Sequence, residues 1–268
     1  MGLSNFRDFF VKKFALLLPF FAVHLFGLPV GNPAAPKLIE EGFFIPCDFW
    51  GSVRIGYEGD FVSDAKMEQF HSSDGRVDSY QQETNSGIIS FNILNRVDLF
   101  GVLGSSRTST DWRFVDAANA VHRIELETNY DFLWGVGIRG ILYQWECLCL
   151  GAGGRYESAR YDPSWITSNG VPEPTSNSLL SWREWQIDLD AGYKIDIFTP
   201  YIGIKYSNAR TMISGLTEVI SQHNQFTNRI PIGVFIGCSL SSSKYFMLNV
   251  EGRLVDEEAV TVSGDIRF

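Results

Sequence analysis

Apolar and polar residues alternate at every second position in several stretches of this chain. In residues 49–62 the apolar side chains Phe49, Val53, Ile55, Tyr57 and Phe61 fall on one face, and Ser52, Arg54, Glu58 and Asp60 fall on the other. Residues 182–196 and 246–254 repeat the pattern. A period of two is that of a β-strand with one apolar face. The pattern therefore predicts an all-β protein.

The same alternation runs to the last residue. Val260, Val262, Gly264, Ile266 and Phe268 share one face of the final stretch. An aromatic carboxy terminus on such a strand is typical of bacterial outer-membrane barrels. We therefore interpret Phe268 as a barrel-assembly signal, and we expect the barrel-assembly machinery to be a partner.

The amino terminus has the layout of a cleaved signal peptide. Arg7, Lys12 and Lys13 precede an apolar run over residues 14–26, which is shorter than the roughly 20 residues of a spanning helix and contains Pro19. Cleavage is predicted after Gly27. The predicted organisation is a signal peptide at 1–27, an N-terminal periplasmic segment at 28–48 and a transmembrane β-barrel at 49–268.

Alternation alone fits two architectures. In a soluble sandwich the polar faces meet water, whereas in a membrane barrel the apolar faces meet lipid and the polar faces line a lumen. The signal peptide, the final Phe268 and the Tyr and Trp residues near predicted strand ends favour the barrel.

The connections between predicted strands alternate in length. Those around residues 94–96, 143–146, 198–200 and 241–244 are short, and the polar stretches 63–85, 162–181 and 214–224 are long. Barrels of this class have short periplasmic turns and longer outer loops. We expect about twelve antiparallel strands, within a range of ten to sixteen, at 49–62, 84–94, 97–107, 109–116, 119–129, 131–143, 147–161, 181–196, 201–213, 225–240, 245–255 and 258–268.

Charge and motifs exclude several function classes. The net charge of −9 becomes −11 once the leader's three basic residues and one acidic residue are removed, and no basic cluster stands out, which argues against nucleic acid as a partner. Residues 135–140 match G-x-G-x-x-G, but strand alternation continues through them, so a nucleotide-binding turn is not favoured. The mature histidines lack zinc-site spacing, and a contact between Asp116 and His122 is weak evidence for catalysis. No catalytic residue, cofactor or metal is expected.

Four cysteines, Cys47, Cys147, Cys149 and Cys238, are disulfide candidates in an exported protein, within the chain or between neighbours. Cys147 and Cys149 are poorly placed to pair with each other, because they lie two positions apart on one strand. Four unpaired thiols are the alternative.

The polar face supplies the candidate site. If the apolar faces meet lipid, a set of charged residues lines the lumen, where side chains of either sign bias which ions pass. The pore-lining candidates are Arg54, Glu58, Arg139, Asp188, Asp190, Lys194, Lys205, Glu251, Arg253 and Asp265, with Arg267 beside them. The alternative is that these groups pair into a plugged, salt-bridged interior.

Several blocks of sequence resemble the chlamydial major outer membrane protein family of porins. They include residues 28–36 (LPVGNPAAP), 56–62 (GYEGDFV), 95–104 (NRVDLFGVLG), 134–139, 145–152, 184–186, 198–205 (FTPYIGIK), 253–257 and 266–268. The blocks keep the family's order over most of the mature chain. This chain is shorter than typical members and has fewer cysteines, and so resembles a shortened or divergent relative.

The resemblance implies an outer-membrane porin, with no enzymatic activity, through which small solutes and ions diffuse passively, and which is also a structural component of the envelope. It further implies a homotrimer, and disulfide links to other envelope proteins are a related expectation. The alternative is a non-conducting structural or adhesive barrel cross-linked by disulfides. In either case we expect contact with outer-membrane lipid.

Overall fold

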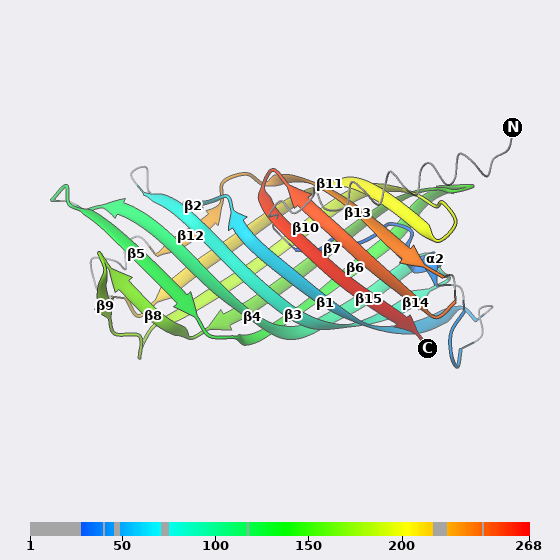
Figure 1. Ribbon diagram of the computed structural model, residues 1–268, viewed down its shortest axis with the longest axis horizontal. Coiled ribbons are helices and arrows are strands. Elements are labelled where there is room, and N and C mark those ends of the chain that lie inside the picture. Colours follow the sequence, from blue (N-terminus) through cyan, green and yellow to red (C-terminus); the bar gives the residue numbers. More distant parts are fainter. Residues whose placement is uncertain are drawn as a thin grey trace, which may run out of the picture.

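The computed structural model describes residues 28–39, 41–45, 49–70, 75–116, 118–216, 224–242 and 244–268. The predicted signal peptide and Cys47 lie outside these ranges. Figure 1 shows long tilted strands wound around one axis. The elements are α2 (Ala35–Leu38), β1 (Gly51–Ala65), β2 (Met67–Gln69), β3 (Arg76–Ile93), β4 (Val97–Val115), β5 (Val121–Thr128), β6 (Asp131–Trp145), β7 (Leu148–Tyr161), β8 (Pro163–Ser168), β9 (Val171–Glu173), β10 (Leu179–Tyr193), β11 (Phe198–Ser214), β12 (Gln225–Asn228), β13 (Ile232–Ser241), β14 (Phe246–Leu254) and β15 (Glu257–Arg267).

The strands close into an antiparallel barrel. Among the described residues, ten strands form the closed circuit β3-β1-β15-β14-β13-β11-β10-β7-β6-β4, and β4 pairs back with β3. The last strand meets the first along residues 54–65. Closure leaves no sheet edge inside the membrane, where an unpaired backbone group would be costly. The predicted all-β barrel is confirmed.

The count of ten, rather than about twelve, comes from two places where separately predicted strands continue one another. The predicted strands 97–107 and 109–116 form the single strand β4. The predicted strands 119–129 and 131–143 correspond to β5 and β6, which lie end to end along β4. Neither junction contains the glycine or proline that a tight reversal favours.

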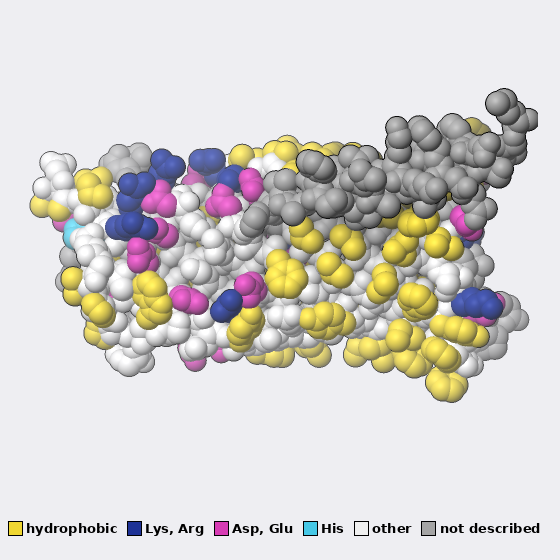
Figure 2. Space-filling view, viewed as in Figure 1, with side chains coloured by type: hydrophobic (Ala, Val, Ile, Leu, Met, Phe, Trp, Pro, Cys, Tyr) yellow, Lys and Arg dark blue, Asp and Glu magenta, His cyan; other side chains and the backbone are white. Residues whose placement is uncertain are grey.

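The two faces of the wall show which solvent each meets. Ile55, Tyr57 and Phe61 of β1 are half exposed on the outside, whereas Arg54 and Glu58 are buried inside. In Figure 2 apolar side chains cover the half of the barrel near the carboxy terminus, and charged groups gather towards the other end. An exposed apolar exterior over a polar interior is the arrangement of a membrane barrel, and it rules out the soluble sandwich.

Two stretches predicted as long outer loops are largely strands. Residues 63–85 contain the end of β1, β2 and the first half of β3, and residues 162–181 contain β8, β9 and the start of β10. The barrel wall therefore extends beyond the band of apolar outward-facing side chains, which we call the apolar belt. In this extension β5 pairs with β8 and β2 pairs with β12. The prediction of loops was wrong here, because polar residues form strands equally well where both faces of a wall meet water or a polar interior.

The segment from Leu28 to Ile39 lies inside the barrel. Leu28, Asn32, Ala35 and Ile39 are all buried, and α2 forms one short turn among them. The expectation of a periplasmic position for this part of residues 28–48 is therefore corrected. Proline and small residues favour a compact, irregular path that fits a narrow lumen. We call residues 28–39 the plug.

No helix within the described residues has the length and apolar character needed to cross a membrane.

Candidate functional site: the barrel interior

Ion pairs cross the lumen near its middle. Arg155 on β7 donates to Glu58 on β1 at 2.6 Å and to Glu157 on its own strand at 2.5 Å. Arg253 on β14 reaches Asp60 at 2.7 Å. All five side chains are almost fully buried. Charges removed from water in this way need partners, and the pair of Arg155 with Glu58 ties β7 to β1 across the lumen.

A second group of charges surrounds Lys205 on β11. Its ammonium contacts Asp256 at 3.2 Å and also pairs with Glu257, both in or next to the turn between β14 and β15. The Lys205 side chain has no exposed surface. A third pair joins Arg54 to Asp98, with Arg139 at 3.4 Å from the same carboxylate.

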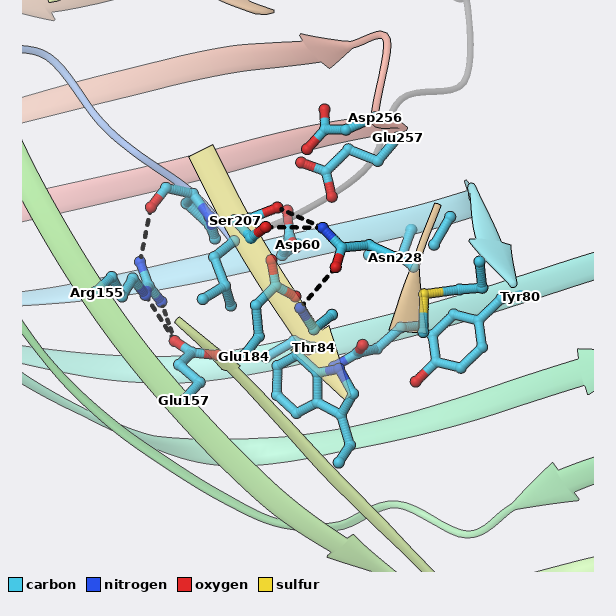
Figure 3. A pocket seen from close by; sticks show the side chains of 18 of the residues that line it. Asp60, Tyr80, Thr84, Arg155, Glu157, Glu184, Ser207, Asn228, Asp256 and Glu257 are labelled. Carbon is cyan, nitrogen blue, oxygen red and sulfur yellow. Dashed lines mark hydrogen bonds and ion pairs between the residues drawn. The ribbon is translucent and has the colours of Figure 1, made fainter. Parts of the chain in front are cut away.

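A small cavity lies between these groups (Figure 3). Its volume is about 30 Å³, enough for one or two waters. Six carboxylates line it but only two basic side chains, Lys66 and Arg155. Lys66 is paired with Asp64. The charged residues that line the cavity are therefore mostly acidic.

The plug is held in the lumen by hydrogen bonds from several strands. The amides of Val30 and Gly31 donate to Glu251 at 3.0 and 2.7 Å. Asn32 donates to the Thr199 carbonyl at 2.9 Å and to the Ser239 hydroxyl at 3.1 Å. At the far end of the plug, backbone carbonyls accept from Arg54 and Arg267. Charged residues of the wall thus bind plug backbone as well as one another.

Apolar side chains fill the lumen on the outer side of the ion pairs. Trp112 and Phe226 pack edge to face at 5.2 Å between ring centroids, and Trp182 and Leu28 belong to the same cluster. Together with the plug, this layer occupies much of the described interior. A ten-stranded barrel is only slightly wider than one that side chains alone can fill.

The structure places most of the predicted pore-lining residues inside. Arg54, Glu58, Asp188, Asp190, Lys205, Glu251 and Arg253 are buried on the inner face, and Arg139 and Asp265 are partly buried there. Asp265 lies against Gly56 of the neighbouring strand. Lys194 differs, because it follows β10 at the turn, where its amide donates to the Cys147 carbonyl at 2.8 Å. Their role in permeation stays a prediction.

Sequence reasoning missed several interior residues. Arg155 and Glu157 follow the glycines at 151, 153 and 154, which hide the alternation of β7. Asp256 and Glu257 lie at a turn, where periodicity ends. Glu184 had a usable signal, since it is two residues before Gln186 on the polar face of the same strand.

The cysteines are unpaired within the described part of the chain. Cys147 is exposed at the turn between β6 and β7, Cys149 is buried and Cys238 is partly buried. Cys149 packs against Ala34, Ala35 and Leu38 of the plug. The predicted disulfides stay untested, because Cys47 is outside the described ranges.

The other motifs also have a structural position. Residues 135–140 lie within β6, paired with β4 and β7, and Gly137 leaves space for the ring of Phe100. His122 and Asp116 do meet, at 3.0 Å, beside the tip between β4 and β5. That hydrogen bond, followed by one from the Ala120 amide, lowers the pKa of Asp116. Phe268 donates its amide to Val53 at 2.9 Å and stacks near Phe44.

Comparison with known proteins finds relatives along nearly the whole chain. A major outer membrane porin of Chlamydia pneumoniae is 26% identical over 370 aligned positions, covering 90% of this chain and 94% of that protein. The serovar F porin of Chlamydia trachomatis is 25% identical, covering 92% and 96%. These alignments are longer than the 268 residues of this chain, so the relatives contain segments that it lacks. No family model matches the chain.

Solved structures with a similar fold include the COG4313 outer membrane channel from Pseudomonas putida F1. It has a TM-score of 0.45 and 11% identity, covering 90% of this chain and 100% of that one. The translocator domain of the autotransporter NalP from Neisseria meningitidis has a TM-score of 0.45 and 10% identity, covering 88% and 92%.

Proposed function

We propose that this chain, a divergent homologue of the chlamydial major outer membrane porins, is itself an outer-membrane porin through which small solutes and ions diffuse passively. The observation that carries the proposal is the polar, charged inner face of a closed barrel whose outer face is apolar. Such a lumen holds water once it is open. No covalent step and no cofactor are part of the proposal.

Passage of solutes through the barrel requires the plug to leave the lumen at least in part. Its contacts are suited to reversible release, because most are individual hydrogen bonds between wall side chains and plug backbone, with Glu251 accepting and Arg54 donating. The apolar contacts of Ala34, Ala35, Leu38 and Ile39 involve few wall residues, among them Ile141, Cys149 and Met247. We therefore propose a porin that is mostly closed and opens when residues 28–39 shift.

The second candidate is a barrel that does not conduct and acts in the envelope as a structural or adhesive protein. The filled interior favours it. In this role the exposed Cys147 would form disulfides with neighbouring envelope proteins, and copies would associate as the predicted trimer. Association with outer-membrane lipid belongs to both candidates, and so does assembly through Phe268.

Single-channel recording from the refolded mature chain in planar bilayers tests the choice. We expect brief, discrete current steps in the wild type. Asn32→Ala removes the bonds of Asn32 to Thr199 and Ser239, so it should raise the open probability at least threefold without changing the step size. The control is Asn208→Ala, on the outward face of β11.

Folding is checked by heat-modifiable migration on gels. Silence from both the wild type and Asn32→Ala, in protein that is folded by this criterion, would reject the porin and favour the structural barrel. Current steps of equal frequency in both proteins would support the porin function and show that the plug is not its gate.

A further inference from the structure

A row of carboxylates runs along the inner face of β10. Glu184, Asp188 and Asp190 all point inward, with Gln186 between them. At about 3.4 Å per residue, Glu184 and Asp190 lie about 20 Å apart along the strand. Because strands of such barrels are tilted by about 40°, the row spans about 15 Å along the barrel axis, about half of the roughly 30 Å hydrocarbon thickness of a bilayer. The row therefore follows much of the lumen.

These carboxylates differ from most other inner acids in having no cation within ion-pair distance, although Lys205 of β11 lies opposite Asp188 in the sheet. Within the described residues, no basic nitrogen forms an ion pair within 4 Å with any of the three, whereas Glu58, Asp60 and Asp98 each have an arginine. Each of the three is more than nine-tenths buried, with 7%, 8% and 7% of its surface exposed in chain order. In Figure 3 Glu184 points into the acidic cavity. Their charge is thus not used to hold the walls together.

The neighbouring strand leaves room for two of these side chains, Asp188 and Asp190. Gly153 and Gly151 of β7 lie beside Asp188 and Asp190 in the sheet. A Cβ atom at Gly153 would come within 2.8 Å of both Asp188 carboxylate oxygens, and one at Gly151 within 2.7 Å of Asp190 Oδ1. A side chain at either position would displace the carboxylate from the wall. The glycines thus let Asp188 and Asp190 lie along the wall, whereas Glu184 lies opposite Glu157 in the sheet.

The plug covers this row without neutralising it. The Pro29 carbonyl accepts from Gln186 at 3.3 Å, and Pro33 lies against Gly151. Residues 28–36 contain no basic side chain, and Lys37, the first in the plug, donates to Gln144 at 3.2 Å. When the plug shifts, the row faces the permeating solution as fixed negative charge.

We propose that Glu184, Asp188 and Asp190 determine the charge selectivity of the open pore and make it prefer small cations over anions. The inference rests on the proposed porin function. Fixed charge of one sign along a narrow, low-dielectric lumen concentrates ions of the opposite sign and repels the others. The paired charges elsewhere in the lumen largely cancel one another and contribute less.

The test is the zero-current potential of the mature full-length chain in a planar bilayer under a tenfold KCl gradient. We expect a potassium-to-chloride permeability ratio of at least about 3. The triple variant E184Q/D188N/D190N should lower the ratio to between 1 and about 1.5. E184Q alone should lower it by a smaller amount. Asp162→Asn, which removes one carboxylate at an exposed position next to β7, should leave the ratio unchanged.

The selectivity of the wild type should weaken as the salt concentration rises, since screening shortens the reach of fixed charge. A wild-type pore that prefers chloride, or a triple variant that conducts with an unchanged ratio, would overturn the selectivity proposal and leave the porin intact. Absence of current in the folded wild type and in Asn32→Ala would overturn both.

Discussion

At the residue scale, the interior depends on pairing charges that are out of contact with water. Lys205 shows this most clearly, because its side chain is fully buried beside Asp256 and Glu257. Burial of an ion costs several kcal/mol, and the cost is offset only while the partner remains. Removing one member of such a pair therefore destabilises the fold by more than the intact pair stabilises it.

The variant Lys205→Met should lower the free energy of unfolding by about 3 to 5 kcal/mol, because it leaves the buried Asp256 without its cation and Glu257 with only Arg253, at 3.8 Å. Urea unfolding of the barrel in lipid vesicles measures this change. The same substitution at the exposed Lys244 is the control and should stay within about 0.5 kcal/mol of the wild type. Equal stability of the two variants would show that water reaches the Lys205 cluster.

At the element scale, each barrel strand has one face for lipid and one for the interior. In β10, Ile187 is 55% exposed on the outside, whereas the adjacent Gln186 is buried and donates to the plug. A shift of register by one residue would exchange these environments along the whole strand. The alternation therefore specifies the register of β10 against β7 and β11.

Ile187→Arg should destabilise the barrel in vesicles by about 2 to 4 kcal/mol, the cost of a charge on the lipid face near the bilayer midplane. Ile187→Leu, which keeps the apolar surface, is the matched control. Tolerance of arginine here would place this part of β10 at the membrane surface instead of within the apolar belt.

The tip between β4 and β5 lies outside the apolar belt, and its order depends on a carboxylate. Asp116 Oδ1 accepts from the amides of Ala118 and Ala120 at 2.8 and 2.9 Å, and Oδ2 contacts His122. These contacts lower the pKa of Asp116. Their contribution is therefore present above the unfolded pKa of about 3.9 and is lost as the pH falls through the lower folded value.

Hydrogen exchange of the Ala118 and Ala120 amides should show this dependence. We expect their protection to hold down to about pH 4 and to fall below it, while amides in the barrel wall stay protected. In Asp116→Ala the protection should be low at every pH. Protection lost already near pH 6 would show that the Asp116 carboxylate does not control the order of this tip.

At the scale of the whole molecule, the plug and the barrel form one packed unit. Cys149 lies beneath the plug, Cys147 is exposed at the turn next to it, and the two thiols therefore report different things. Cys147 reports access from solvent, whereas Cys149 reports displacement of residues 34–38.

A water-soluble maleimide should label Cys147 within minutes and Cys149 at least tenfold more slowly in the wild type. Asn32→Ala should speed the labelling of Cys149 at least threefold and leave Cys147 unchanged. Mass spectrometry of peptides distinguishes the sites. Rapid labelling of Cys149 in the wild type would mean that the plug does not reside in the lumen.

The sequence by itself determined the strands, their inward and outward faces and the short turns, because alternation and turn chemistry act between residues that are close along the chain. It also predicted most inward charges, such as Arg54 and Arg253, and a resemblance that the comparisons support. The tertiary structure alone decided the ten-strand closure, the partner of each charge and the position of the plug. These depend on contacts such as Arg253 with Asp60 and Val30 with Glu251, whose members are about two hundred residues apart and meet only when the barrel closes.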